Sequence, residues 1–137
     1  MDVKITDNSD EVLAELERKI TKALETVGLQ AEGDAKLELE NPPRRIDTGR
    51  LRNSITYAHR GRSGFSNQYK DDDGEEYSEE IGNVPEDDKA VYIGTNVEYA
   101  EEIHEGRPGL DPNRFLRNAV EKNITTYQKM IEDVLKE

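Results

Sequence analysis

The side chains that could carry out acid–base catalysis near neutral pH are few. His59 and His104 are the two histidines of the chain, and neither has a Ser or Asp partner at a spacing typical of a catalytic triad. His59 stands among arginines in a predicted strand, which favours a surface role. We therefore expect no enzyme activity and no cofactor.

One short segment combines the ligand types of a metal site. Carboxylates and an imidazole suit several divalent ions, and they occur together at Glu101, Glu102, His104 and Glu105. A small metal-dependent enzyme would need such an ion, but we favour the alternative of a solvated helical turn and predict no metal. The chain has no Cys, which excludes disulfides, thiolate zinc sites and a cysteine nucleophile.

The charges of the chain fall into two adjacent blocks of opposite sign. The 137 residues carry a net charge of −12, which opposes binding to the outside of nucleic acid. Ten acidic residues and no basic one lie between Asp71 and Asp88. Just upstream, a single acidic residue, Asp47, opposes a run of arginines, namely Arg44, Arg45, Arg50, Arg52, Arg60 and Arg62. Paired guanidinium–carboxylate geometry makes this basic block a candidate docking face for carboxylates.

Two segments show helical periodicity. Leu13, Leu16 and Ile20 begin an apolar stripe that continues past Val27, and it predicts a long helix that starts at an Asn8–Glu11 capping box and ends before Pro42. Val3 and Ile5 alternate with polar residues and predict a short strand before it. Asp111 and Pro112 have the residue types of an N-cap and a first helical position, so we expect a second helix to start there. Its predicted stripe consists of Leu116, Ala119, Val120, Ile124, Tyr127, Ile131 and Val134.

Two further segments show the period of a strand. Leu51, Ile55 and Tyr57 alternate with polar residues, and residues 90–93 form a second run that stops at Gly94. The residues between them are too acidic to form a core element unaided, so we expect the tip of a long hairpin that is mobile in the isolated subunit. The predicted class is α+β, with the long N-terminal helix and the C-terminal helix packed on one face of a small antiparallel sheet that carries a long acidic hairpin or loop. We expect one domain, 1–137, with an acidic insertion at about 61–89.

No apolar run approaches the roughly 18 residues that cross a bilayer, and the first four residues lack the pattern of a signal peptide. We therefore expect a protein without a membrane partner.

Three passages, Ile46–Ile55, Ile93–Ala100 and Asn113–Ala119, read IDTGRLRNSI, IGTNVEYA and NRFLRNA. In order and spacing they resemble the siphophage tail-completion or head-to-tail joining family, the minor tail components of lambda-like phages and prophages. That family shows D-T-G-x-L-x-x-S, then V-G-T-x-x-x-Y-A, a glycine, and P-F-L-R-P-A opening the last helix; Asn113 and Asn118 depart from this pattern. The positions that fit, which we expect to maintain the fold or form an interface, are Asp47, Thr48, Gly49, Arg50, Leu51, Arg52, Ser54, Gly94, Thr95, Tyr99, Ala100, Gly106, Pro112, Phe115 and Leu116.

The resemblance implies a virion protein at the head–tail junction, assembled in the host cytoplasm as a ring of six copies. Its partners would be other copies of itself, the tail tube or tail terminator protein, and the head connector or adaptor protein, with DNA only passing through the channel. From the charge blocks, we expect Arg50 and Arg52 to face acidic surface of the next copy, so that their reversal to Glu blocks assembly and leaves the monomer folded.

The resemblance does not cover the acidic segment. Its residues are either a solvated loop or a lining of the channel that repels passing DNA, and they are Asp71, Asp72, Asp73, Glu75, Glu76, Glu79 and Glu80. The alternative function is that of an acidic regulatory binding module that occupies a basic partner.

Overall fold

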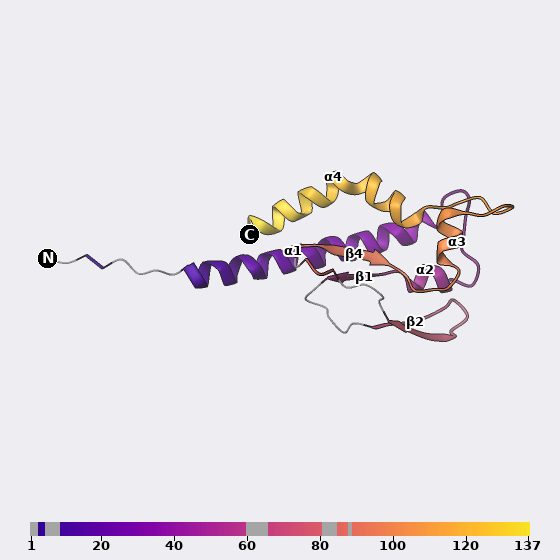
Figure 1. The fold of residues 1–137 in the computed structure, drawn as a ribbon, viewed down its shortest axis with the longest axis horizontal. Helices are drawn as coiled ribbons and strands as arrows, with labels where there is room; N and C mark the ends of the chain where they lie inside the picture. Colours follow the sequence, from indigo (N-terminus) through magenta and orange to yellow (C-terminus); the bar gives the residue numbers. More distant parts are fainter. Residues whose placement is uncertain (1–2, 5–8, 60–65, 81–84, 88) are drawn as a thin grey trace.

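The fold is α+β, with two long helices and two small antiparallel sheets (Figure 1). The computed structural model describes all residues except 1–2, 5–8, 60–65, 81–84 and 88. Its elements are α1 (Ser9–Glu38), α2 (Arg50–Ser54), β1 (Thr56–His59), β2 (Ser66–Lys70), β3 (Glu76–Glu80), β4 (Val91–Gly94), α3 (Ala100–Glu105) and α4 (Phe115–Leu135). The first sheet pairs β1 with β4, and α1 packs on it while α4 lies alongside α1. The predicted fold class is confirmed.

The long N-terminal helix is continuous through its two glycines. Gly28 is buried on the face toward the first sheet, where a Cβ would lie 2.5 Å from Cδ2 of Tyr57. The absence of a side chain therefore lets β1 approach the helix closely. Gly33 has open space around it. Val3 lies in no strand, whereas Ile5 and the capping residue Asn8 lie outside the described residues.

The first half of the predicted helical stripe is not covered by the rest of the chain. Ala23, Leu24 and Val27 are buried, but Leu13 and Leu16 are 57% and 47% exposed. The reason is that α4 ends before it reaches this part of α1. Glu137, just after α4, forms an ion pair with Lys22, which marks how far α4 runs back along α1. Figure 1 shows the N-terminal part of α1 projecting beyond α4.

The prediction of a strand that includes Leu51 is wrong for the first half of that strand. Residues Arg50–Ser54 form the short helix α2, and the strand begins only at Thr56. Leu51 and Ile55 are four residues apart, a spacing that satisfies a helical turn as well as a strand. In the structure the side chains of Leu51, Ser54 and Ile55 are all buried.

The acidic segment forms a hairpin of its own. Strands β2 and β3 pair antiparallel, with Tyr69 opposite Tyr77, and make a second sheet that packs against α2. We call residues 66–80 the acidic hairpin. Residues 66–80 of the expected hairpin tip thus form paired strands, and Arg50 and Arg52 of α2 supply charge compensation to them.

The last helix begins later than predicted. Its first residue is Phe115, not a position next to Asp111. Pro112 instead packs against Gly106, and the Asn113 amide is held by carbonyls at the end of α1, which keeps residues 111–114 out of the helix. On α4 itself Ala119, Tyr127 and Val134 are buried as expected. Val120 and Ile124 lie on an exposed flank, 36% and 48% accessible.

Candidate docking site

The three passages that carry the family resemblance meet in one core cluster. Leu51 and Ile55 from the first, Val97 and Ala100 from the second, and Phe115 from the third are all buried there. Ala35, Leu39 and Ala119 complete the cluster, and Ile93, Tyr99 and Leu116 pack against it half-buried. Apolar contact among these residues fixes the relative positions of α2, α3 and the start of α4. Gly94 is the last residue of β4, and it pairs with Thr56 of β1.

Gly49 is the tightest point of the first passage. Its φ of 83° lies in the left-handed region, and a Cβ there would lie 2.4 Å from the carboxylate carbon of Asp72. The backbone N–H of Asp72 donates to the Thr48 carbonyl at 2.7 Å, while the Thr48 hydroxyl accepts from the Arg50 N–H at 3.3 Å. Glycine is therefore required twice, for its conformation and for the approach of the acidic hairpin. The predicted turn with positive φ is confirmed, although it leads into a helix.

Arg50 joins the acidic hairpin to the turn before α3. Its guanidinium donates to Glu98 at 3.0 and 3.1 Å and to Glu79 at 3.1 Å, and it lies 4.4 Å from the centre of the Tyr77 ring. The backbone N–H of Glu98 and, next, the Arg50 guanidinium lower the pKa of the Glu98 carboxyl. Tyr69 donates to Glu79 in the same cluster, and burial raises its pKa to about 12, with Glu79 adding to the rise and Arg50 opposing it.

Arg52 and Asn53 hold the turn of the acidic hairpin. Arg52 donates to Asp72 at 2.6 Å, and the Asn53 amide donates to the same carboxylate at 3.3 Å and to the Lys70 carbonyl at 2.8 Å. Because Arg50 and Arg52 both bind carboxylates of their own chain, reversing them to Glu would detach the acidic hairpin. Such a variant therefore cannot test contact between copies in a folded monomer.

Hydroxyl groups link the first two passages. The Ser54 hydroxyl lies 2.6 Å from that of Thr95 and donates to the Leu51 carbonyl, while Thr95 accepts from the Val97 N–H at 3.2 Å. Tyr99 stands at the start of α3, 5.8 Å from the Arg50 guanidinium across its ring. These contacts give the predicted positions structural roles.

Gly106 and Asn113 position the third passage. Gly106 ends α3 with a φ of 79°, and a Cβ would lie 2.9 Å from the Leu110 carbonyl oxygen. The buried Asn113 amide donates to the carbonyls of Glu38 and Pro43 at 3.1 and 3.0 Å. Sequence reasoning regarded Asn113 only as a departure from the family pattern. The sequence does contain one signal for this contact. Pro42 and Pro43 end α1 and leave its last carbonyls without helical donors, so these carbonyls need a donor from elsewhere in the chain.

The acidic residues divide into fixed and exposed groups. Asp71 is buried, and its carboxylate accepts from the N–H groups of Asp73 and Glu75 in the turn. Asp72 and Glu79 are held by arginines as described, whereas Asp73, Glu75 and Glu76 are exposed. Glu80 pairs through its backbone with Ser66. A test of the channel-lining hypothesis should therefore neutralise only Asp73, Glu75 and Glu76.

The two histidines have structural surroundings. The surface role expected for His59 is wrong, because its side chain is 1% exposed and its Nε2 lies 3.5 Å from a carboxylate oxygen of Glu25. His104 lies 2.7 Å from Glu105, lowers the pKa of that carboxyl, and accepts from the Arg117 N–H at the start of α4. Within the described part of the chain, no three His, Asp or Glu side chains are arranged to hold a metal ion.

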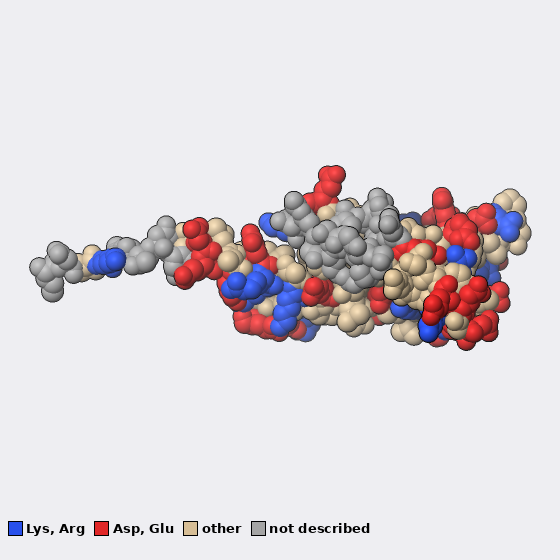
Figure 2. Space-filling view, turned by 90° about the horizontal axis from the view of Figure 1, so that it is seen from below, with Lys and Arg blue, Asp and Glu red and all other residues tan. Residues whose placement is uncertain are grey.

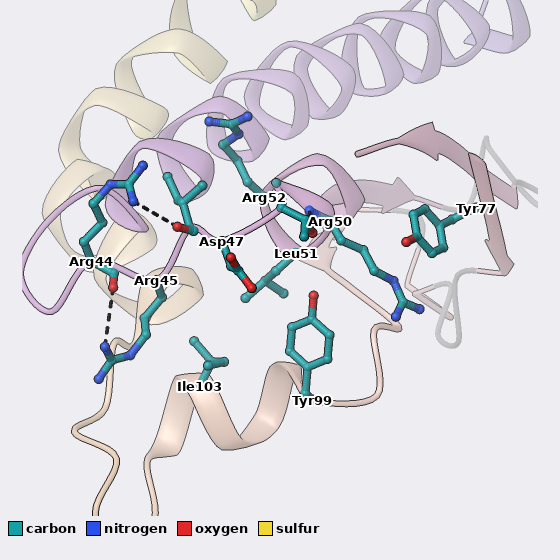
Figure 3. Close-up of a pocket in the computed structure, with 12 residues that line it drawn as sticks. Arg44, Arg45, Asp47, Arg50, Leu51, Arg52, Tyr77, Tyr99 and Ile103 are labelled. Carbon is teal, nitrogen blue, oxygen red and sulfur yellow. Dashed lines mark hydrogen bonds between the residues drawn. The ribbon is translucent and has the colours of Figure 1, made fainter. Parts of the chain in front are cut away.

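A hollow of about 520 Å³ opens beside the first passage (Figure 3). The loop of residues 44–49 and α2 form one side, Ile103 and Tyr99 form the other, and Tyr77 lies at one edge beyond Arg50. Four arginines and two tyrosines therefore line this hollow.

Comparison of the chain with protein-family models, with curated proteins and with solved structures gave no match. No helix among the described residues is long and apolar enough to cross a membrane.

Proposed function

We propose that this chain is a structural virion protein that forms a ring at the head–tail junction, completes the tail and joins it to the portal connector. The ring would contain six copies and contact the tail tube or tail terminator protein on one side and the head connector or adaptor protein on the other. The three resembling passages support this family role, since they build one common core.

The observation that carries the proposal is the uncovered apolar face of α1. Val12, Leu13 and Leu16 continue the stripe that is buried further along the helix, yet each is about half exposed or more. Burying one such side chain contributes about 1.5–3 kcal/mol relative to full exposure. A helix that extends its apolar stripe past its own core is suited to pack against a second chain.

A second uncovered apolar patch lies elsewhere on the molecule. Val120 and Ile124 are exposed on α4 at the level of Asp34 of α1, which binds the nearby Tyr127 hydroxyl at 2.6 Å. Leu13 and Asp34 are separated by 21 helical steps, or about 31 Å along α1. We infer that the α1 face of one copy packs on the α4 patch of the next. Contact between two different patches is heterologous, and such contact gives a ring where the rotation between copies closes and an open filament where it does not.

Complementary variants test this arrangement. Leu13→Glu with Leu16→Glu disables the α1 face, and Val120→Glu with Ile124→Glu disables the α4 patch. Each double variant alone should remain monomeric, also when tail tubes are present. An equimolar mixture of the two should form a dimer, because one variant keeps its α4 patch and the other keeps its α1 face. Light scattering coupled to size-exclusion chromatography measures both. Leu29→Glu is the matched control, because Leu29 is 61% exposed on the other side of α1.

The wild-type chain should form a closed ring, alone or on tail tubes from the same virus. A wild-type chain that stays monomeric and ignores tail tubes would overturn the assembly role and favour the regulatory binding module. Assembly that both double variants retain would instead show that the ring uses other surfaces.

A further inference from the structure

The hollow beside the first passage contains two arginines that are paired with no carboxylate among the described residues. Four arginines line it, but Arg50 and Arg52 are paired with Glu79, Glu98 and Asp72. They are neutralised within the chain and contribute little net charge to the opening.

Arg44 and Arg45 differ from their neighbours. Arg44 donates to the Ile46 carbonyl at 2.9 Å, and Arg45 donates to the Asp111 carbonyl at 2.8 Å and to the Arg44 carbonyl at 3.4 Å. Across the described residues, neither guanidinium has a carboxylate within ion-pair distance, although Asp47 also lines the hollow. The buried Nε of Arg45, like that of Arg50, has no acceptor among those residues.

Arg44 is exposed and Arg45 is half-buried, so of these two residues only Arg45, through its Nε, has a buried donor without an acceptor among the described residues. A buried donor without a partner costs about 1–3 kcal/mol, and hydrogen bonds to an ionised acceptor are among the strong ones. In a chain with 31 acidic and 19 basic residues, two adjacent arginines that bind only carbonyls are an exception. An incoming carboxylate would give the two guanidinium groups the ionised acceptor that they lack.

The surroundings decide which anion fits. Figure 2 shows acidic side chains over much of the surface at the end that carries the acidic hairpin, and such a surface repels any occupant that spreads many negative charges across it, an extended phosphate backbone included. A single carboxylate on a peptide can instead enter between the arginines while its chain passes over Tyr77, Tyr99 and Ile103. The volume of about 520 Å³ admits a few side chains.

We propose that this hollow binds an acidic segment of a partner protein, with Arg44 and Arg45 as the residues that bind its carboxylates and the two tyrosines as apolar walls. The identity of the partner as a protein of the head–tail junction rests on the proposed function. The affinity of the hollow for carboxylates does not.

The test uses the full chain and a capped hexapeptide in which one Asp and one Glu stand among uncharged residues, with binding followed by calorimetry and by amide NMR shifts. Arg44→Gln with Arg45→Gln should weaken binding at least tenfold, and Arg44→Gln alone, which removes only a contact to a neighbouring carbonyl, should weaken it several-fold. Arg107→Gln with Arg117→Gln removes the same charge from exposed arginines elsewhere and should change affinity less than twofold.

Equal losses in the hollow and control variants, or no binding of the peptide, would overturn the inference. So would tighter binding of inorganic phosphate or of a single-stranded oligonucleotide of equal charge. Peptide binding by a chain that forms no ring would support the carboxylate site and overturn only the assembly role. Ring formation without peptide binding would overturn the carboxylate site alone.

Discussion

Replacing Gly49 by Ala tests whether the first passage works by holding the acidic hairpin against α2. Gly49 and Gly74 both have a left-handed backbone, with φ of 83° and 87°. An L-residue pays about 1–2 kcal/mol for this conformation. At Gly74 nothing lies within 4 Å of the added Cβ, so Gly74→Ala should cost only that amount.

At Gly49 the added methyl group would also displace Asp72, whose carboxylate carbon lies 2.4 Å from the Cβ position. That shift removes the partly exposed ion pair with Arg52, worth up to about 1 kcal/mol. It also removes hydrogen bonds to Asn53 and Thr48, worth about 0.5–1.5 kcal/mol each. We therefore expect Gly49→Ala to destabilise the chain by about 2 kcal/mol more than Gly74→Ala does.

Urea unfolding followed by circular dichroism measures both free energies of unfolding. Hydrogen exchange of the β2 and β3 amides should show which part opens, with loss of protection in the acidic hairpin for Gly49→Ala. The double variant with Gly49→Ala and Asp72→Ala should lose less free energy of unfolding than the two single variants lose together, because the clash and the lost contacts involve the same pair of residues. Equal destabilisation by Gly49→Ala and Gly74→Ala would refute the reasoning.

Three further predictions follow from single side chains. Gly28→Ala should destabilise the chain, because its methyl group would meet the Tyr57 ring at 2.5 Å, whereas Gly33→Ala, in open space on the same helix, should stabilise it by about 1 kcal/mol in urea unfolding. Burial raises the pKa of Tyr69 to about 12, so the neutral hydroxyl stabilises the folded chain. This stability is fully present below pH 10 and is lost as the pH rises to 12, a loss of about 2 kcal/mol after allowance for partial exposure. Tyr69→Phe should remove the loss in an alkaline unfolding series. Asn113→Ala should destabilise the chain by about 1–3 kcal/mol in thermal unfolding, because it leaves buried carbonyls without a donor, and an unchanged midpoint would contradict this.

Local periodicity predicted the long elements well and their ends poorly. The stripe around Val27 fixed α1 and its buried face, because helical spacing over many residues has one simple explanation. The same signal could not show that Leu13 is uncovered, since this depends on where α4 ends. The start of α4 was misplaced because Asn113 is held by carbonyls some 70 residues earlier in the chain. Contacts of that kind leave no local pattern at the residue concerned.

The positions of the resembling passages were predicted more completely than their roles. Gly49 was expected to need a positive φ, and the structure adds the carboxylate of Asp72 as a second reason for glycine. The part of Asp72 could not be predicted, because the acidic segment was expected to lack a fixed position. Its docking depends on the register of α2, in which Arg50 and Arg52 project toward the acidic hairpin.

The adjacent blocks of opposite charge have a different meaning from the one their sequence indicates. Complementary blocks are expected to join separate copies only if each block is free in the monomer. Here Arg50 and Arg52 are paired within the chain, so half of the described basic block stabilises the acidic hairpin and cannot orient a neighbour. Arg44 and Arg45 lie before the turn at Gly49 and line one edge of the hollow. The backbone conformation of one glycine therefore separates arginines that hold the fold from arginines that are open to a partner.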